Sequence, residues 1–450
     1  MHVGRQFWVC PNHPAASMAN AGTDPDHPWT TLQDVLSVQP PLEFVSGSVL
    51  WAGPGWHGVV HILPQHHRQV MTLGDTEREV RVSIVALQDE DRPRVGSVYV
   101  APYSTCWLLQ GLVVEPPTTP DTALSSPPPL GIHVGADTVG VVARQCTVRG
   151  SPAYGIVVAG GLHALLDCVV EDAGGIAFSE DAPSPLLANV VVGCRVQNFH
   201  SEFGLLLGPS VGQVTGCTVV QAHPSTHSRM TSLCTVRVAG LGVQFHDNKF
   251  LCRAVEDGGD ATAWEPVPTH GVEINGPKWW SIQNNIILVD HAIGLCILND
   301  TKSVVAHNTV VRCARRPWFA AQVPMLSVRV TQRGRATIPT VGGTLVLNNL
   351  VERVYVFNAT VLASDNVELA QAQFRAVFED HPRDLRPRAR LPALEGCSFG
   401  DSLRSPDQAP VTCNDATAAL RPTEASDFRP CVGALEPPHS ITHGVDGERV

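Results

Sequence analysis

Charge and long apolar runs are scarce in this chain of 450 residues. Charged residues make up only 16% of it, tyrosine occurs 4 times, and the formal net charge is -11. A surplus of negative charge argues against nucleic acid as a general partner. No apolar run approaches the ~20 residues that a membrane-spanning helix needs. We therefore expect neither a nucleic-acid partner nor a membrane partner.

A secretory leader is also missing from the start of the chain. The first residues, Met1 to Cys10, lack the apolar centre of a signal peptide. The expectation from the residues alone is a cytoplasmic protein, provided that the chain is complete.

Helical periodicity is the third absence. The apolar runs are short, rich in Val and broken by Gly, whereas an amphipathic helix needs apolar residues every three or four positions. With 44% hydrophobic residues the chain has the composition of an ordered protein. Short strands are therefore the expected element.

One pattern recurs from Cys146 to Val220. A Cys-x-Val triplet occurs four times and alternates with apolar runs led by Gly; these begin at Cys146, Gly155, Cys168, Gly175, Cys194, Gly204 and Cys217. Two short strands in a unit of roughly 22 to 26 residues suit one coil of a parallel β-helix. Further on, an Asn takes the Cys position at Asn248, Asn285, Asn308 and Asn349. We expect these Asn side chains to stack into a hydrogen-bonded ladder.

The cysteines number 13. Because four of them share one register, the favoured interpretation is a column of free, buried thiols that act as small hydrophobic groups. Disulfides between coils are the alternative, and the odd count would leave at least one thiol without an intramolecular partner.

Three parts are expected along the chain. Residues 1–46 form an N-terminal cap module, in which Thr31 and Asp34 resemble a capping box for a short helix from Leu32 to about Val38. Residues 47–367 form the β-helix. Residues 368–450 form an irregular C-terminal tail packed on the helix, with mobile last residues.

The N-terminal module resembles the opening of right-handed parallel β-helix proteins in the pectate-lyase-like superfamily. The similarity rests on Trp8 to Pro11, Gly22-Thr23, Pro28 to Gln33 and Gly53 to Gly58. It departs by placing Trp56 at the usual aromatic position and by lacking an early Gly. The resemblance implies an all-β, right-handed parallel β-helix, a single-stranded solenoid with a short capping helix.

In a regular solenoid, equivalent turns stack about 4.8 Å apart, so residues distant in the sequence meet along one edge. The turns that follow the Cys and Asn strands carry acids and histidines, and the arginines come late. The catalytic candidates are Asp257 and Asp260 as the acid/base pair, with Asp172 and Glu202 in reserve. The substrate-binding candidates are His200, His291, Trp264 and Arg315.

Three chemistries fit such an edge. Glycoside hydrolysis needs two carboxylates, and the four acids supply them. Polysaccharide β-elimination needs a cation and a base, for which Arg315 and His291 are available. No cofactor or metal is expected, although clustered carboxylates could bind Ca²⁺. A zinc site at His223 and His227 is the weakest interpretation, because the pair lies in a Pro/Ser loop.

A narrower resemblance concerns two segments. His163 to Phe178 is similar to a coil of glycoside hydrolase family 141, and Cys252 to Trp264 is similar to that family's acidic loop. The resemblance implies a hydrolase acting on plant or microbial glycans, with Asp257 or Asp260 at the cleft. It also implies a secreted protein, unlike the expectation from the first residues.

The sequence thus favours a carbohydrate-active enzyme, a glycoside hydrolase whose partner is a polysaccharide or oligosaccharide. The alternative is a non-catalytic β-helix that serves as a scaffold or binds glycans. A polysaccharide lyase is the third interpretation. The fold by itself hosts all of these.

Overall fold

A computed structural model describes most of the first two thirds of the chain and short segments after that. The described residues are 4–67, 81–116, 131–151, 153–179, 188–221, 232–237, 243–252, 270–275, 280–289, 293–298, 303–312, 326–329, 344–347, 349–351, 354–357, 361–364, 366–368, 378–380 and 384–387.

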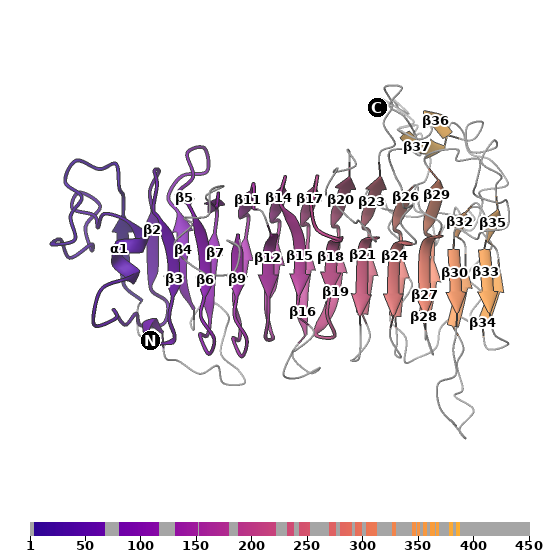
Figure 1. Ribbon diagram of the computed structural model, residues 1–450, viewed down its shortest axis with the longest axis horizontal. Helices are drawn as coiled ribbons and strands as arrows, with labels where there is room; N and C mark the ends of the chain where they lie inside the picture. Colours follow the sequence, from indigo (N-terminus) through magenta and orange to yellow (C-terminus); the bar gives the residue numbers. More distant parts are fainter. Residues whose placement is uncertain are drawn as a thin grey trace, which may run out of the picture.

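Three long parallel sheets run the length of the molecule, which is elongated (Figure 1). Sheet A is β1 (Gln6–Val9), β2 (Val49–Ala52), β4 (Val82–Ala86), β7 (Trp107–Gln110), β10 (Val142–Arg144), β13 (Ala164–Leu166), β16 (Asn189–Val192), β19 (Val211–Thr215), β22 (Val243–His246), β25 (Trp280–Gln283), β28 (Ser303–Ala306), β31 (Thr344–Leu347) and β34 (Val361–Ser364).

Sheet B is β5 (Arg94–Val95), β8 (Val113–Val114), β11 (Thr147–Arg149), β14 (Val169–Glu171), β17 (Arg195–Gln197), β20 (Thr218–Gln221), β23 (Lys249–Cys252), β26 (Ile286–Val289), β29 (Thr309–Arg312), β32 (Leu350–Val351) and β35 (Val367–Glu368). Sheet C is β3 (Val59–Ile62), β6 (Ser97–Val100), β9 (Ile132–Val134), β12 (Tyr154–Val158), β15 (Gly174–Phe178), β18 (Phe203–Leu207), β21 (Ser232–Arg237), β24 (His270–Asn275), β27 (Ile293–Leu298), β30 (Leu326–Arg329) and β33 (Val354–Phe357).

From β4 to β33, each coil contributes one strand to each sheet, in the order A, B, C. Strand β10 pairs with β7 and β13, its equivalents one coil before and one coil after. Successive strands of one sheet are therefore separated by a full turn of the chain, and such crossovers are right-handed. The predicted right-handed parallel β-helix is confirmed.

The interior is a set of stacked apolar columns. In sheet A, Cα pairing aligns five fully or almost fully buried residues; they are Leu109, Ala143, Leu165, Val191 and Val214. Alternate residues of each strand face out, as the two-residue period of a strand requires. The core thus follows from the alternation of Val and Leu with polar residues in the strands.

The turn from sheet A to sheet B has a repeated form. A residue with left-handed backbone, such as Gln145 (φ 53°) or Asp167 (φ 53°), precedes an inward residue. In four successive coils that inward residue is Cys. Each thiol donates to a sheet A carbonyl one coil earlier; the Sγ to O distances are Cys146 to Leu109 3.5 Å, Cys168 to Ala143 3.4 Å, Cys194 to Leu165 3.5 Å and Cys217 to Val191 3.6 Å.

All four of these cysteines are free and at most 1% exposed. The column of buried thiols is therefore confirmed, and the alternative of disulfides between these coils is wrong. The parallel coils already hold the chain, so the thiols fill space and make weak hydrogen bonds.

An Asn ladder continues the same column. Asn248 donates from Nδ2 to Asn285 Oδ1 over 3.0 Å, and Asn285, Asn308 and Asn349 each donate in the same way to the next Asn. Each Nδ2 also donates to a sheet A carbonyl one coil earlier, for example Asn248 to Val214 O at 3.0 Å. The predicted ladder is confirmed, and within the described residues it runs to Asn366.

The short helix α1 (Leu32–Leu36) begins at the predicted cap. Thr31 Oγ1 accepts from the Asp34 backbone N–H over 3.0 Å and donates to the Asp34 carboxylate over 2.7 Å. The helix ends at Leu36, two residues before the predicted end. Gln33 Oε1 accepts from Val59 N over 2.9 Å, which fixes α1 against the first strand of sheet C. A 3₁₀ turn, η1 (Pro64–His66), follows that strand.

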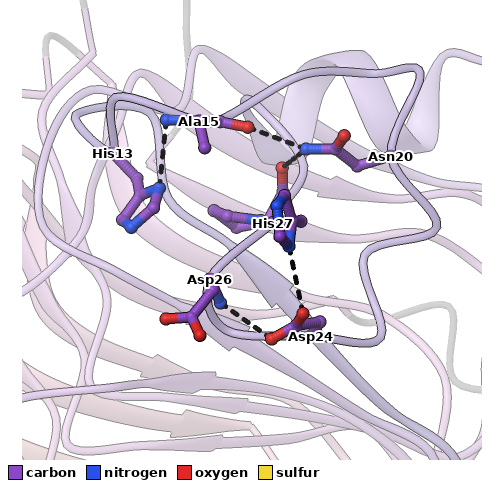
Figure 2. A network of polar contacts seen from close by, with 7 residues as sticks. His13, Ala15, Asn20, Asp24, Asp26 and His27 are labelled. Carbon is purple, nitrogen blue, oxygen red and sulfur yellow. Dashed lines mark hydrogen bonds and ion pairs between the residues drawn. The ribbon is translucent and has the colours of Figure 1, made fainter.

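The loop between β1 and α1 is held by its own polar contacts (Figure 2). Asn20 Nδ2 donates to the carbonyls of Ala15 and Pro28, and Asp24 contacts His27 over 3.0 Å. Trp29 Nε1 donates to Asn20 O. These contacts have a structural role, because they close the loop over the first coil.

Beyond the last strand of sheet B, β36 (Phe378–Asp380) and β37 (Asp384–Pro387) form an antiparallel pair. The division of the chain at residues 46 and 367 remains a prediction.

Candidate functional site

In the sequence, every candidate site residue lies between a sheet B strand and the next sheet C strand, and we call these connections the B–C edge. In the chain each candidate follows a sheet B strand and precedes a sheet C strand; Asp172 follows β14, His200 and Glu202 follow β17, Asp257, Asp260 and Trp264 follow β23, His291 follows β26, and Arg315 follows β29. The structure brings Asp172, His200 and Glu202 to this edge on two adjacent coils.

Asp172 lies in a left-handed backbone conformation, with φ 47°. Gly150 and Asn198, at the same position one coil before and one coil after, share it, with φ 63° and 52°. Each of the three donates its N–H to a carbonyl of the next coil. Asp and Asn tolerate this conformation better than most residues. The exposed Asp172 therefore has a sufficient conformational reason to be present.

The preceding residue, Glu171, belongs to a polar row on the outer face of sheet B. Its carboxylate accepts from Arg149 Nε over 3.0 Å and from Gln197 Nε2 over 2.6 Å. Arg149, Glu171 and Gln197 occupy one column of three coils. Since both oxygens of Glu171 have partners within the sheet, its carboxylate is fixed and serves to align the coils.

Glu202 is exposed at the end of the next connection. Its carbonyl accepts from Ser232 N over 3.4 Å, which ties this turn to the following coil. The negative charge of Glu202 acts on Tyr154, at the start of β12. Burial raises the pKa of Tyr154, the charge of Glu202 raises it further, and Arg237 at the end of β21 lowers it. Tyr154 and Arg237 belong to strands of sheet C and Glu202 to the turn before another, and we call these three residues the Tyr–Glu–Arg site.

This site combines three chemical capacities. The phenol of Tyr154 stays protonated at neutral pH and can donate a hydrogen bond. An exposed carboxylate can transfer a proton or accept one, and the guanidinium of Arg237 can donate to hydroxyl or carboxylate oxygens. The face of sheet C next to the B–C edge can thus bind and polarise a hydroxyl-rich ligand.

His200 is exposed on the same turn as Glu202. Its backbone N–H donates to Ala173 O over 2.9 Å, and this bond fixes the turn to the coil before it. The side chain of His200 is exposed, two residues before Glu202 in the chain. His200 remains a candidate for substrate binding.

Five candidates lie outside the described residues, and their roles stay predictions. They are Asp257, Asp260, Trp264, His291 and Arg315. The proposed zinc pair, His223 and His227, lies outside them as well.

Sequence reasoning did not find Tyr154 and Arg237. Tyr154 directly precedes the Gly-led apolar run that begins at Gly155, just as Phe203 precedes the run at Gly204. This repeated aromatic position could have identified Tyr154 from the sequence. Arg237 gave no comparable signal, because the strand that carries it, β21, follows a long connection of variable spacing.

The described part of the chain lacks two other kinds of site. No group of three or more His, Cys, Asp or Glu side chains there could hold a metal ion. None of its helices has both the length and the apolar character to cross a membrane.

Comparison with known proteins finds similarity in structure alone. No family model and no curated protein sequence matches the chain. Among solved structures, pectate lyase Pel9A is similar with a TM-score of 0.40 and 12% sequence identity, covering 97% of this chain and 98% of that one. A rhamnogalacturonan lyase has a TM-score of 0.40 and 15% identity, covering 88% of this chain and 96% of that one.

A glycoside hydrolase has the same architecture. The lacto-N-biosidase of family GH136 from Eubacterium ramulus has a TM-score of 0.39 and 11% identity, covering 81% of this chain and 68% of that one. Identities and TM-scores this low describe a shared architecture. No catalytic residue is transferred from these proteins to this chain.

Proposed function

We propose that the protein is a carbohydrate-active enzyme, a glycoside hydrolase that cleaves a polysaccharide lying along the B–C edge. The observation that carries the proposal is the exposed carboxylate of Glu202 at the B–C edge, together with the phenol of Tyr154 at the start of β12 and the guanidinium of Arg237 at the end of β21. Hydroxyl-rich substrates suit this combination of donors and acceptors.

Hydrolysis needs a second carboxylate, and the coil spacing suggests which one. Asp257 and Asp260 follow β23, two coils after the strand that precedes Glu202. Two coil spacings amount to about 10 Å, near the separation of carboxylates in inverting enzymes. Asp172 is one coil away, about 5 Å, which would suit a retaining enzyme. Because Asp172 has a conformational role, we assign the pair as Glu202 with Asp257 or Asp260.

In this assignment one carboxylic acid protonates the leaving oxygen while the other carboxylate activates a water on the opposite face of the sugar. Tyr154 and Arg237 hold the sugar through hydrogen bonds. A lyase would need a base at this position. The raised pKa of Tyr154 disfavours that role, because the phenol keeps its proton at neutral pH.

The test is release of reducing sugar from a panel of polysaccharides. Glu202→Gln, Asp257→Asn and Asp260→Asn each remove one charge and little volume, and we expect Glu202→Gln to lower the rate about a hundredfold or more. Asp137→Asn is the matched control, because Asp137 is an exposed Asp with φ 56° outside the B–C edge. Its rate should equal that of the unmodified protein.

Full activity of Glu202→Gln would remove Glu202 from the mechanism. Activity lost with Asp172→Asn and kept with Asp257→Asn and Asp260→Asn would move the second carboxylate to Asp172. The anomer released first, followed by NMR, then separates inversion from retention. A folded protein that releases no sugar from any glycan would favour the non-catalytic scaffold or glycan-binding protein.

A further inference from the structure

The first coils of sheet C carry a row of ring side chains on their outer face. In β3, Val60 and Ile62 are fully buried, so Val59 and His61 face out. Cα pairing aligns His61 with Tyr99 of β6 and Tyr99 with His133 of β9. The three rings therefore follow one another along the helix axis, one coil apart.

These rings contact one another directly. The ring centroids of His61 and Tyr99 are 4.9 Å apart and those of Tyr99 and His133 are 5.1 Å apart, both edge-to-face. Edge-to-face packing fixes the row without covering its outer side.

Trp56 pairs with Arg94 of β5, so it lies in the sheet B position, just before the B–C edge of the first coils. A Cβ placed on Gly96 would lie 3.4 Å from Trp56 Cη2 and Cζ2, so the indole packs against the backbone at Gly96. Trp56 is still 50% exposed, and the outward Val59 is 42% exposed. An indole held from one side and open on the other is a preformed surface for a flat apolar ligand.

The surface carries little charge at neutral pH. Burial lowers the pKa of both His61 and His133, which keeps their imidazoles neutral. The nearby Arg94 is paired with Glu115. Ring faces with nitrogen and hydroxyl groups at their margins match a ligand with apolar faces and a hydroxyl rim. A sugar ring has that form, and because Arg94 is already paired with Glu115, an anionic sugar is disfavoured.

We propose that Trp56, His61, Tyr99 and His133, which we call the aromatic strip, form a binding surface for a neutral polysaccharide. The indole stacks on a pyranose face, and the imidazoles and phenol bind hydroxyl groups of the following units. The column of the strip continues along sheet C to Val157 of β12, three residues after Tyr154 in the same strand. One ligand chain can therefore reach from the strip to the Tyr–Glu–Arg site. The inference rests on the proposed function for its ligand class.

Affinity electrophoresis tests the strip without requiring catalysis. The full chain is run through gels containing hydroxyethyl cellulose, galactomannan, xyloglucan, laminarin or polygalacturonate. Trp56→Ala and Tyr99→Ala are compared with Tyr103→Ala, the matched control, since Tyr103 is 69% exposed in the turn that follows β6. Thermal melting shows that each variant is folded, and His61→Ala replaces any that is not.

We expect at least one neutral polysaccharide to retard the protein, with affinity lowered roughly tenfold by Trp56→Ala and by Tyr99→Ala and unchanged by Tyr103→Ala. Polygalacturonate should retard it least. Equal retardation of all variants, or no retardation by any neutral polysaccharide, overturns the proposal. Light scattering that shows dimers lost in Trp56→Ala, with glycan binding unchanged, overturns it in favour of a second copy as the occupant.

The two proposals fail separately. Binding that depends on Trp56, without sugar release by the unmodified protein, keeps the strip and removes the hydrolase. Sugar release that depends on Glu202, with binding unaffected by Trp56→Ala and Tyr99→Ala, keeps the hydrolase and removes the strip.

Discussion

From β10 to β34, the inward position after each sheet A strand is filled by one of two residue types, Cys or Asn, which stabilise the coils in different ways. Cys217 and Asn248 occupy it in adjacent coils, and both donate to a sheet A carbonyl of the coil before, Cys217 to Val191 and Asn248 to Val214. A thiol is a weak donor and a small apolar group, whereas an amide donates twice and accepts. The thiol coils therefore depend more on packing, and the amide coils more on directional bonds.

Replacing Cys217 by Asn should extend the ladder by one coil. Asn248 Oδ1 already accepts from Cys217 N over 2.9 Å, and the Val191 carbonyl is within reach of the new amide. We expect Cys217→Asn to leave the free energy of unfolding within about 1 kcal/mol of its original value. Urea denaturation followed by circular dichroism measures it.

Asn308→Ala is the contrasting change. It removes the acceptor for the backbone N–H and Nδ2 of Asn285, at 3.1 and 2.8 Å, and the donor to Ile282 O. Buried polar groups without partners cost about 1 to 3 kcal/mol each. A loss of at least ~3 kcal/mol in the same urea experiment is expected. A loss below ~1 kcal/mol would show that the ladder adds little to stability.

His163 should make stability depend on pH. It is 2% exposed, its Nδ1 accepts from Val141 N over 3.0 Å, and burial lowers its pKa to about 4. The unfolded chain binds a proton near pH 6.5 and the folded one only near pH 4. The contribution is therefore complete above pH 6.5 and is lost as the pH falls toward 4, by about 3 kcal/mol at the limit.

His163→Asn isolates this effect. We expect the variant to be less stable than the original at pH 7.5 and to lose less stability between pH 7.5 and pH 4.5. Urea midpoints at the two pH values measure the difference. Equal losses in both proteins would show that other groups carry the acid sensitivity.

At the scale of one element, the corner from sheet B to sheet C limits side-chain size. A Cβ on Gly175, in β15, would lie 2.1 Å from Gly204 O of the next coil. Gly150, in the turn before β12, has φ 63°, and a Cβ there would meet nothing within 4 Å. Gly175 is therefore favoured by the close approach of two backbones, whereas Gly150 is favoured by its left-handed backbone conformation.

The two glycines should therefore respond differently to substitution. Gly175→Ala must move backbone and should cost about 3 kcal/mol. Gly150→Asn should cost below ~1 kcal/mol, because Asn198 adopts the same conformation one coil after Asp172. Thermal melting of the two variants compares them, and a milder effect at Gly175 would contradict the close approach.

The strands and the ladder were predictable from the sequence because each depends on a local pattern that repeats. Val alternation defines the strands, and the spacing of Cys and Asn defines the coil. The Tyr–Glu–Arg site was only partly predictable. Glu202 was a candidate, but Tyr154 lies two coils earlier and Arg237 lies at the end of β21, so no local pattern connects the three residues. The conformational role of Asp172 depends on a backbone angle that its neighbours in the sequence do not reveal.

At the scale of the whole molecule, the solenoid has an end that needs covering. Helix α1 buries Leu32, Val35 and Leu36, and its Gln33 binds the backbone of β3. An uncovered coil would present unpaired strand groups and apolar side chains to other copies. We therefore expect α1 to act as a cap that limits end-to-end association.

Val35→Asp should release the cap, because Val35 is fully buried and a carboxylate cannot be accommodated there without a partner. We expect concentration-dependent oligomers by light scattering. Asp34→Asn, on the exposed side of the same helix, should stay at the oligomeric state of the original. Val35→Asp without any change of oligomeric state would show that α1 is dispensable as a cap.

The direction of the hydrogen bonds between coils has a mechanical consequence. These bonds run parallel to the long axis, so a force that pulls the two ends apart acts along them. Each coil is bonded only to its neighbours, and the outermost coil therefore detaches before the next one is loaded. Under tension the chain should lengthen in regular steps, each releasing one coil of roughly 22 to 26 residues, or about 80 Å of extended backbone.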